Sequence, residues 1–422
     1  MTPIDRRTGL DGSGCRACGH RTLSPVLDMG EHPEANTFPD SPEEGRVLPR
    51  WPLRAFVCTN CWLFQLDDSG PAEAALPGPP AYELSETMRG HAHRFVEDVL
   101  ARHPLPSDDH RVIELASHGT YLQPFLAERG VRSVIVEGSA SLADAATHAG
   151  RAVLAKPFGL ATAHELVANG GAADLVIDNY LLAHVSDPSE FAAALETVLR
   201  PGGVAVLEFD HVLRLIIERR FDSLRHGHFS YFGLTSVRGL LERHGLTVFD
   251  AEPQSVYGGA LRVYVAHTDD AAHRMSTEVG RMLDAERDAG LSGIPRYRSF
   301  ASGVAALREE LVAFLIARKT SGDSVVAYGA PSRGNTLLNY GAITTDLVAY
   351  TVDRSPLKQG HYLPGSGLAI QDPGRIFETR PAFVLILTWD LREEVMRQLR
   401  GIDAWGGRFV VPLPHITVLP AH

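Results

Sequence analysis

The stretch at residues 111–119, Arg-Val-Ile-Glu-Leu-Ala-Ser-His-Gly, carries the clearest structural signal in the chain. Its first five residues, Arg111 to Leu115, include three large apolar side chains and are predicted to form a strand. The strand enters a turn of small residues, and a helix is expected from about Tyr121. Strand, small-residue turn and helix in that order are typical of α/β domains, which hold their ligands at the carboxyl ends of the strands.

The same alternation continues along the chain. Ser133–Glu137, Asp174–Asn179 and Gly203–Phe209 are predicted strands, and Phe191–Leu199 is a predicted amphipathic helix. A further helix is expected from Leu84 to Arg102, ahead of the first strand. Strands and helices that alternate in this way indicate a mostly parallel sheet with helices on both faces.

A second unit of the same kind is predicted near the C-terminus. Ser324–Tyr328 is a predicted strand that runs into a turn of small residues with Arg333, and Leu347–Asp353 and Ala382–Leu387 are further strands. Backbone N–H groups at such a turn cradle phosphate, and an arginine suits a diphosphate. Two alternatives stay open. The turn only packs, or the unit binds a nicotinamide cofactor whose ribose is held by Asp353.

All four cysteines lie in two pairs, Cys15-x-x-Cys18 and Cys58-x-x-Cys61. Two such pairs supply the four thiolates of a tetrahedral zinc site. Disulfides and a redox pair are the alternatives, but the start of the chain shows no export signal, and two pairs without a spare cysteine favour a closed metal site. Because four cysteines leave no open coordination position, the zinc is expected to be structural.

Length and charge narrow the class of protein. The chain has 422 residues, too many for one hydrophobic core, so two or three domains are expected. Its 51 acidic and 40 basic side chains leave a net charge of -11, which argues against a nucleic-acid partner because such proteins need clustered cations. The N-terminus has no apolar signal core and no apolar run has the length of a membrane span. The protein is therefore expected in the cytoplasm, without a membrane partner.

The second predicted strand ends in an acid, Glu137. At that place a carboxylate can accept hydrogen bonds from the two hydroxyls of a ribose, so Glu137 and the small-residue turn together indicate an adenosine-type ligand. The alternative is that Glu137 is an exposed neighbour of a helix N-terminus. Similarly, His184 follows the strand that ends at Asn179 and is either a ligand contact or a structural histidine.

Longer motifs carry a resemblance to a known family. Besides the cysteine pairs, they are Leu182–Val185, Phe221–Phe232, Tyr257–Val265, Ala327–Tyr340, Asp353–Gly360 and Tyr362–Gly365. In this order and over nearly the whole chain, they resemble the three-domain, zinc-containing C-methyltransferases of deoxysugar biosynthesis, which depend on S-adenosylmethionine.

The resemblance implies an α/β protein with three parts. They are an N-terminal zinc-binding module at 1–80, a central class I methyltransferase Rossmann-like domain with a linker helix at 81–268, and a helical connection with a second Rossmann-like α/β domain at 269–422. The implied cofactors are S-adenosylmethionine and a structural Zn²⁺. The implied substrate is a nucleotide-linked 4-keto deoxysugar, with dTDP as the nucleotide, which is methylated beside the ketone during antibiotic biosynthesis. One chain then holds a complete site, which agrees with a monomer, although the sequence does not set the oligomeric state.

In this family a base removes the proton beside the ketone, and the carbanion attacks the sulfonium methyl group. A histidine suits the base, and the enolate oxygen needs positioned donors. The resemblance places the base at His228, with His226 two residues before it. Arg225 stands where the family has tyrosine and is a candidate cation for the enolate, and Gly227 stands where the family has glutamate. Tyr82 matches a tyrosine that reaches the sugar, unless it only anchors the linker to the core.

The remaining candidate residues form two groups. Those for the cofactor are Glu114, Ala116, Ser117, His118, Gly119, Glu137, Asn179 and His184. Those for the nucleotide sugar are Gly329, Ser332, Arg333, Gly334, Asn335, Arg354 and Lys358.

Three functions compete at this point. A sugar C-methyltransferase is favoured by the length of the resemblance. A divergent enzyme on the same scaffold is favoured by Arg225, by Gly227 and by the turn after Leu115, which lacks the acid and one glycine of the usual family loop. Such an enzyme would be an isomerase, a combined ketoreductase and methyltransferase, or a methyltransferase for a substrate that is not a sugar. A zinc-binding interaction protein explains the cysteines but leaves both ligand turns without a role.

Overall fold

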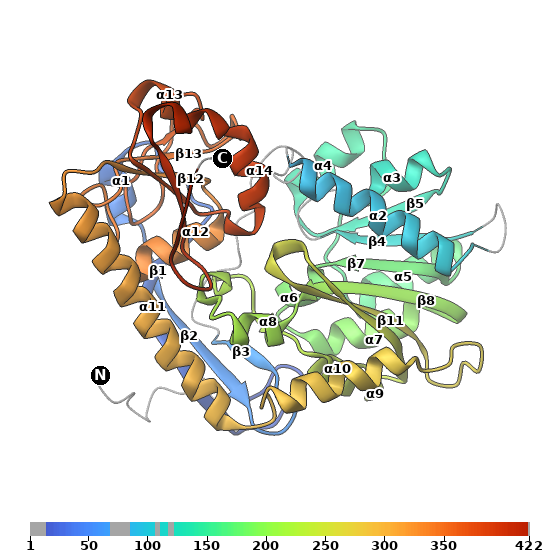
Figure 1. Ribbon diagram of the computed structural model, residues 1–422. Helices are drawn as coiled ribbons and strands as arrows, with labels where there is room; N and C mark the ends of the chain where they lie inside the picture. Colours follow the sequence, from blue (N-terminus) through green and yellow to red (C-terminus); the bar gives the residue numbers. More distant parts are fainter. Residues whose placement is uncertain (1–13, 68–84, 106–109, 117–121, 421–422) are drawn as a thin grey trace.

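The computed structural model describes residues 14–67, 85–105, 110–116 and 122–420. The strands within them form three sheets, of four, seven and six strands. Figure 1 shows the N-terminal strands in blue beside the long helix α11, the central sheet in cyan and green, and the C-terminal unit in orange and red. The predicted α/β class is confirmed.

The first sheet is antiparallel and has the order β1-β2-β3-β9. Its strands are β1 (Leu23–Pro33), β2 (Arg50–Cys58), β3 (Phe64–Leu66) and β9 (Ser230–Tyr231). Between β1 and β2, the short helix α1 (Pro42–Val47) begins where the Ser41 hydroxyl accepts the N–H of Glu44 at 3.1 Å. Because β9 comes from the middle of the chain, the first sheet incorporates a segment of the predicted central domain.

The second sheet has the order β10-β11-β8-β7-β4-β5-β6, and β11 runs antiparallel to both of its neighbours. Its strands are β4 (Val112–Ala116), β5 (Ser133–Glu137), β6 (Val153–Leu154), β7 (Ala173–Asn179), β8 (Leu199–Asp210), β10 (Leu246–Gln254) and β11 (Ala260–His267). Successive side chains of a strand point to opposite faces. In β4, accordingly, Ile113 and Leu115 belong to one core cluster and Val112 to another.

Helices cover both faces of this central sheet. Phe95 of α2 (Glu86–Arg102) and Leu126 of α3 (Gln123–Glu128) pack on the face that carries Val112. The helices that pack on the opposite face are α5 (Leu160–Gly170), α7 (Pro188–Val198), α9 (Leu234–Glu242) and α10 (Thr277–Asp288). The shorter elements of this region are α4 (Ala140–His148), α6 (Leu181–His184), α8 (Val212–Ile217), η2 (Phe221–Ser223) and η3 (Val256–Gly258).

The third sheet has the order β14-β13-β12-β15-β16-β17 and is parallel except for β17. Its strands are β12 (Val325–Tyr328), β13 (Thr351–Val352), β14 (Ile370–Gln371), β15 (Phe383–Ile386), β16 (Arg408–Val411) and β17 (Thr417–Leu419). Its helices are α11 (Ile294–Thr320), α12 (Ser332–Tyr340), α13 (Arg375–Thr379), η4 (Trp389–Leu391), α14 (Arg392–Gln398) and η5 (Arg400–Trp405). With β12 central and crossovers to both sides, this order has a topological switch point at β12 and β15, where open α/β sheets bind ligands.

One apolar core joins the first sheet to the third. Leu53 of β2 and Phe64 of β3 belong to the same buried cluster as Leu307 of α11 and Leu385 of β15. Both α11 and α12 contact β1. The zinc module therefore shares its interior with the C-terminal unit, and the predicted boundaries after residues 80 and 268 stay predictions.

Two predicted strands have different lengths in the structure. The strand expected at Leu347–Asp353 is reduced to Thr351–Val352, because the N–H groups of Leu347 and Val348 donate to the Thr344 carbonyl and hold the chain in a turn. The strand expected from Gly203 begins earlier, at Leu199, because this residue pairs with Ala173 of β7.

A buried ionic network lies beside the central sheet. The Glu208 carboxylate, fully buried on β8, accepts hydrogen bonds from His91 Nε2 at 2.7 Å and from Arg262 Nε at 2.9 Å. The Arg262 guanidinium lies 4.1 Å above the ring of Phe95 and also contacts Glu252 at 3.1 Å. Although burial alone raises the pKa of Glu208, its cationic partners lower the pKa overall, so this carboxylate is ionised in the folded protein.

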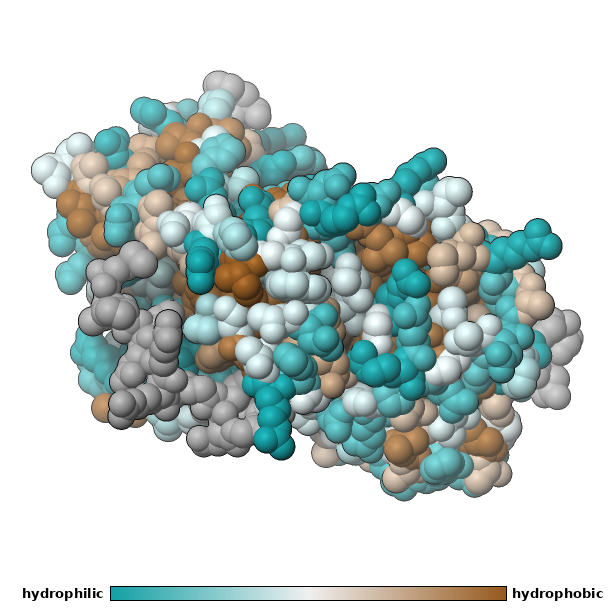
Figure 2. Space-filling model, turned by 90° about the horizontal axis from the view of Figure 1, so that it is seen from below, coloured by the Kyte–Doolittle hydropathy of each residue, from teal (hydrophilic) through white to brown (hydrophobic). Residues whose placement is uncertain are grey.

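On the face shown in Figure 2, hydrophobic residues form small groups between hydrophilic ones. The large apolar side chains that are exposed come from separate elements; examples are Val47, Met275 and Ile316. Within the described parts of the chain, no helix combines the length and the hydropathy that crossing a membrane requires.

Substituting Arg262→Ala is expected to destabilise the protein strongly. The change leaves the buried charge of Glu208 with His91 as its remaining ionic partner, and removing one partner of a buried ion pair costs about 3–5 kcal/mol. Urea unfolding measures the loss. In the control, Arg238→Ala, an exposed pair with Glu242 on α9 is removed, and the expected loss is under about 0.5 kcal/mol. Similar losses in the two variants would contradict the assignment.

Candidate functional site

The four cysteines meet in one cluster near the end of β2. The sulfur atoms of Cys15, Cys18, Cys58 and Cys61 all lie within 4.8 Å of one another. Cys15 Sγ is 3.5 Å from Cys61 Sγ, and Cys18 Sγ is 3.7 Å from Cys58 Sγ. A Zn–S bond of about 2.3 Å gives a tetrahedron with edges of about 3.8 Å, so the four sulfur atoms fit a tetrahedral zinc ion.

Local backbone geometry builds the cluster from two tight turns. The Gly19 N–H donates to the Cys15 carbonyl at 2.8 Å, and Gly19 has a φ of 69°, which glycine adopts without strain. In the second turn the N–H of Asn60 donates to Cys58 Sγ at 3.4 Å, and its side-chain amide reaches Cys18 Sγ at 3.6 Å. Donors aimed at sulfur favour the thiolate form that binds zinc.

The predicted cofactor residues lie at the carboxyl edge of the central sheet, as far as the structure describes them. Glu137 is the last residue of β5, and its Oε1 accepts the N–H of Ser139 at 2.8 Å. Ala116 ends β4, and Asn179 ends β7. Ser117, His118, Gly119 and the proposed sugar contact Tyr82 lie outside the described residues.

Glu114 is buried inside β4, next to this edge. Its Oε1 accepts the N–H of Leu122 at 3.3 Å, and its Oε2 has no hydrogen-bond partner among the described residues. Burial raises the pKa of Glu114 to about 7, although the Leu122 hydrogen bond opposes the rise. One oxygen of this buried carboxyl group is therefore left without a donor among the described residues, next to the carboxyl edge of the sheet.

Asp178 was not among the predicted residues, yet it shapes the edge of β7. Its carboxylate accepts the N–H groups of Leu181 at 2.7 Å and Leu182 at 3.1 Å, and it thereby starts the short helix α6. Between Asp178 and Leu181, Tyr180 has a φ of 73°, in the left-handed region. This sharp turn brings His184 to the end of α6, beside the loop that carries His228.

His228 is buried, with 1% of its surface exposed, and lies among three side chains. Its ring stacks on that of Tyr231, with centroids 4.2 Å apart, and meets the His184 ring edge-on at 4.8 Å. Its Nε2 is 3.8 Å from Asp210 Oδ2. Asp210 ends β8 as Glu137 ends β5, and this shared position was the signal that could have predicted it.

Two further catalytic candidates, His226 and Arg225, have hydrogen bonds to backbone carbonyls. His226 Nε2 donates to the Pro52 carbonyl of β2 at 3.1 Å, and burial lowers the pKa of this histidine. Arg225 Nη1 donates to the Ser223 carbonyl at 3.3 Å, and its backbone N–H donates to Tyr231 Oη at 3.3 Å. The structure therefore groups His228 with Asp210 and places His226 against the first sheet.

Gly227 explains how His184 is held. It has a φ of 79°, which a side chain such as the family glutamate would adopt only with strain, and its carbonyl accepts a hydrogen bond from His184 Nδ1 at 2.8 Å. The loop thus presents a backbone acceptor to His184 at the point where the family has an acid.

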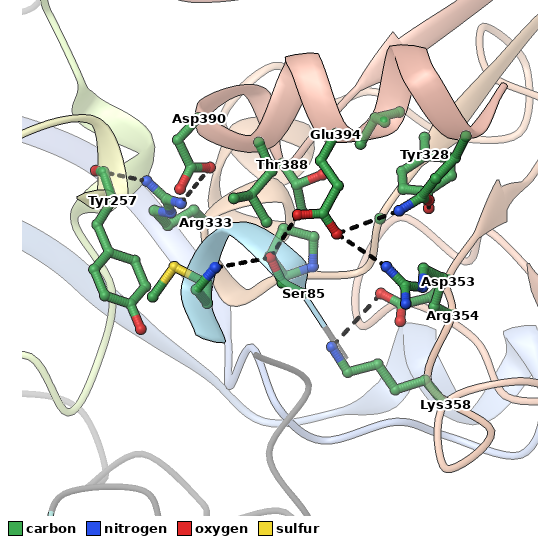
Figure 3. A pocket seen from close by; sticks show the side chains of 16 residues that line it. Ser85, Tyr257, Tyr328, Arg333, Asp353, Arg354, Lys358, Thr388, Asp390 and Glu394 are labelled. Carbon is green, nitrogen blue, oxygen red and sulfur yellow. Dashed lines mark hydrogen bonds and ion pairs between the residues drawn. The ribbon is translucent and has the colours of Figure 1, made fainter. Parts of the chain in front are cut away.

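A cavity of about 170 Å³ lies at the switch point of the third sheet (Figure 3). Its walls come from the carboxyl ends of β12, β13 and β15, from α14, from the start of α2 and from η3. Of the predicted substrate residues, Gly329, Arg333, Arg354 and Lys358 line it, whereas Ser332, Gly334 and Asn335 do not. Ser332 Oγ instead donates to Asn36 at 2.9 Å, and a Cβ on Gly334 would meet Leu387 at 2.8 Å.

Each cation of this cavity has a carboxylate partner. Arg333 Nη2 is 2.7 Å from Asp390, and Arg354 Nη1 is 3.0 Å from Glu394. Lys358 Nζ is 3.7 Å from Asp353 and donates to the Ala330 carbonyl at 2.8 Å. Burial works against the charge of Arg333, but the neighbouring carboxylates outweigh it and raise its pKa. The arginine predicted to bind a diphosphate is therefore already paired, and Arg354, with 38% of its side chain exposed, is the most accessible of the three cations.

Comparison with known proteins places these features in context. Three family models match the chain: a "Putative zinc binding domain" at residues 15–75, a "Methyltransferase domain" at 88–251 and a "C-methyltransferase C-terminal domain" at 255–414. The chain is 30% identical to the C-methyltransferase NovU of Streptomyces niveus over 410 residues, which is 96% of this chain and 97% of that protein. It is 32% identical to the ubiquinone biosynthesis O-methyltransferase of Caulobacter sp. (strain K31) over 116 residues, 27% of this chain and 45% of that protein.

Solved methyltransferase structures match the chain at a lower level. The magnesium protoporphyrin IX methyltransferase of Synechocystis PCC 6803 with bound S-adenosylmethionine matches with a TM-score of 0.33 and 14% identity, over 42% of this chain and 79% of that one. This likeness is too low to carry a functional argument.

The four-cysteine module and the matched methyltransferase domain define a zinc-containing methyltransferase that uses S-adenosylmethionine. The chain belongs to the C-methyltransferase family, because the relation to NovU extends over nearly the full length of both proteins. The cofactors implied by the sequence are thereby confirmed, whereas the roles of individual residues stay proposals.

Changing Cys58→Ser is expected to abolish stable zinc binding. The variant leaves three thiolates around the metal and removes the ligand that ends β2. Metal analysis after dialysis should find about one zinc per wild-type chain and at least tenfold weaker retention in the variant. Thr59→Ala, one residue away and outside the cluster, is the control and should keep its zinc. Equal zinc content in all three proteins would contradict the site.

The pKa of Glu114, about 7, predicts how stability changes with pH. The unfolded carboxyl group loses its proton near pH 4.3, so between about pH 4.3 and 7 the folded state binds more protons and its stability falls as pH rises. The Glu114→Gln side chain cannot ionise. The free energy of unfolding of this variant should therefore fall by about 3 kcal/mol less than that of the wild type as pH rises. Urea unfolding at pH 5 and at pH 8 compares the two proteins. A variant with an unchanged fall would exclude Glu114 as its source.

Proposed function

We propose that this chain methylates the carbon beside the ketone of a nucleotide-linked 4-keto deoxysugar, with dTDP as the nucleotide, in natural-product biosynthesis. The observation that carries the proposal is the buried His228, 3.8 Å from the Asp210 carboxylate at the carboxyl edge of the methyltransferase sheet. A carbon becomes nucleophilic only after it loses a proton, so carbon methylation needs a base at this edge. An imidazole with a carboxylate neighbour suits that role.

The neighbours of His228 support its function as the base. Asp210 stabilises the imidazolium that forms when the ring takes the proton from the sugar carbon. The stacked ring of Tyr231 holds the imidazole in one orientation, and the Tyr231 hydroxyl is itself fixed by donating to the Ser223 carbonyl at 2.8 Å. Afterwards the proton passes from the ring to solvent, which restores the base.

At the strand ends, we assign the cofactor contacts to Glu137, Asn179 and His184. When bound, S-adenosylmethionine supplies an electrophilic methyl group on a sulfonium sulfur. Glu137 suits the ribose hydroxyls because it ends β5 with its carboxylate held by Ser139. Arg225, which lies in the same loop as His228, is the proposed donor to the enolate oxygen.

The cavity of the third sheet is the proposed site of the nucleotide. Arg354 is assigned to the diphosphate because it is the most accessible cation there, and a phosphate can replace Glu394 as its partner. Ser85 and Met88, at the start of α2, also line the cavity, so a ligand in it contacts the central domain as well as the third sheet. This arrangement supports a substrate that extends from the third sheet toward the central one.

A second candidate function is proton exchange at the keto sugar without methyl transfer. It is favoured by Gly227, whose backbone carbonyl takes the place of an acidic side chain beside His184. The first experiment therefore incubates a dTDP-linked 4-keto-2,6-dideoxyhexose with the protein in heavy water and methyl-labelled S-adenosylmethionine. A labelled methyl group on the ring, found by mass spectrometry, supports the first function. Deuterium beside the ketone without the methyl group supports the second, and an unchanged sugar contradicts both.

His228→Ala is expected to lower the rates of exchange and of methyl transfer by about 10²–10⁴-fold, the usual contribution of general acid–base catalysis. Circular dichroism and zinc content should stay unchanged. His244→Ala is the matched control, because this histidine contacts Ser189 of α7, is not among the proposed site residues, and should keep its full rate. A variant of His228 with the wild-type rate would remove this residue from the role of base.

A further inference from the structure

Asp210 has a second charged neighbour besides His228. Arg220 Nη2 lies 3.7 Å from Asp210 Oδ1, while His228 Nε2 lies 3.8 Å from Asp210 Oδ2. The carboxylate is thus placed between an arginine and the histidine. Arg220 has 1% of its surface exposed, and a buried charge requires a defined set of partners.

The remaining contacts of Arg220 reach a strained turn. Its Nη1 donates to the Gly259 carbonyl at 3.4 Å, and its Nη2 donates to the Tyr257 carbonyl. Tyr257, Gly258 and Gly259 have φ values of 51°, 82° and 133°, all in the region that disfavours side chains. Backbone strain of this kind persists only where the surrounding contacts hold it, and it is common near functional sites.

The same turn forms part of the wall of the nucleotide cavity. Tyr257 lines the cavity, and its carbonyl also accepts a hydrogen bond from Arg333 Nη1 at 3.2 Å (Figure 3). Arg220 and Arg333 lie 5.3 Å and 5.4 Å from the ring of Trp389, so both guanidinium groups pack on one indole. The indole N–H donates to the buried Asp222 at 2.7 Å.

A contact between two rings links this turn to the carboxyl end of β7, where the cofactor is proposed to bind. The ring of Tyr257 meets that of Tyr180 edge-on at 4.7 Å, and Tyr180 directly follows β7. A Cβ on Gly258 would lie 2.4 Å from Trp389, so the turn can pack against the indole only with glycine at position 258. The turn therefore has contacts with the cavity, with the edge of β7 and, through Arg220, with the carboxylate beside His228.

We propose that Arg220 is a positioning residue that orients Asp210, and through it the base His228, and that it ties this pair to the turn at 257–259 beside the nucleotide cavity. The inference rests on the proposed role of His228. Because Asp210 is held on one side by Arg220, its other oxygen faces the imidazole in a fixed geometry. A ligand in the cavity that contacts Tyr257 is thereby linked to Arg220, because the Tyr257 carbonyl accepts a hydrogen bond from Arg220.

Titration of the His228 ring tests the link without any substrate. Among the described residues, the titratable or charged groups near this ring are Asp210 from β8, His184 from α6, Tyr231 from β9 and, through Asp210, Arg220. Removing the cation with Arg220→Gln should raise the pKa of His228 by about half a unit or more, because the carboxylate then interacts with the imidazolium alone. Asp210→Asn should lower it by about one unit.

The measurement uses the full chain with its zinc and ¹⁵N-labelled histidine, followed by NMR over pH. Arg214→Gln is the matched control: its stem also touches the turn at Gly259, but its ion pair is with Glu218, so the His228 titration should not move. Arg220→Lys, which keeps the charge, should show less than half the shift of the glutamine variant. If Arg220→Gln does not fold, the lysine variant and Asp210→Asn decide the question.

Kinetics provide the second readout. With the dTDP-linked keto sugar as probe, Arg220→Gln should lower kcat for deuterium exchange about 10–100-fold with KM changed less than threefold, and the acidic limb of the pH profile should move upward with the His228 titration. A His228 titration that is unmoved in both Arg220 variants, or in Asp210→Asn, overturns the inference. If His228→Ala keeps the wild-type exchange rate, the proposed function is overturned instead. The titration would then still show whether Arg220 and Asp210 interact with the His228 ring.

Discussion

The loop that carries His228 is linked to the four-cysteine cluster through the first sheet. Cys58 ends β2, and the turn through Cys61 leads directly into β3. β3 pairs with β9, and β9 begins two residues after His228. A metal held by the four cysteines would close this hairpin and so hold β3, the strand that pairs with β9 just after His228. A structural metal of that kind contributes folding free energy.

Electrostatic compensation is the second condition that the structure meets. Glu208, Asp210 and Arg220 are all buried, and each has oppositely charged neighbours. The cavity of the third sheet follows the same rule, because its three cations are paired with three carboxylates. The charges of such a cavity are neutralised before a ligand binds. An anionic ligand would therefore replace a carboxylate as the partner of a cation, rather than bind an unpaired positive charge. Pairing of this kind favours orientation and selectivity over raw affinity.

Much of this protein was readable along the chain. The central strands, the α/β class and the zinc site follow from local patterns: Ser133–Glu137 is a strand with the predicted ends, and the two cysteine pairs have the spacing of a four-thiolate metal cluster. The prediction was wrong at Leu347–Asp353, where a turn closed by hydrogen bonds from Leu347 and Val348 to the Thr344 carbonyl replaces the first part of the expected strand. Asp210 was missed because the predicted strand, Gly203–Phe209, ended one residue before it.

The sequence alone therefore determined which elements form and which side chains are chemically equipped, because periodicity, turn residues and cysteine spacing act over a few residues. The tertiary structure decided which of them meet. It inserted β9 into the N-terminal sheet, set Asp210 between His228 and Arg220, and brought Tyr257 to the wall of a cavity built by the third sheet. These are contacts between segments far apart in the chain. They are selected by the burial of apolar surface and the pairing of buried charge over the whole molecule, which no local pattern records.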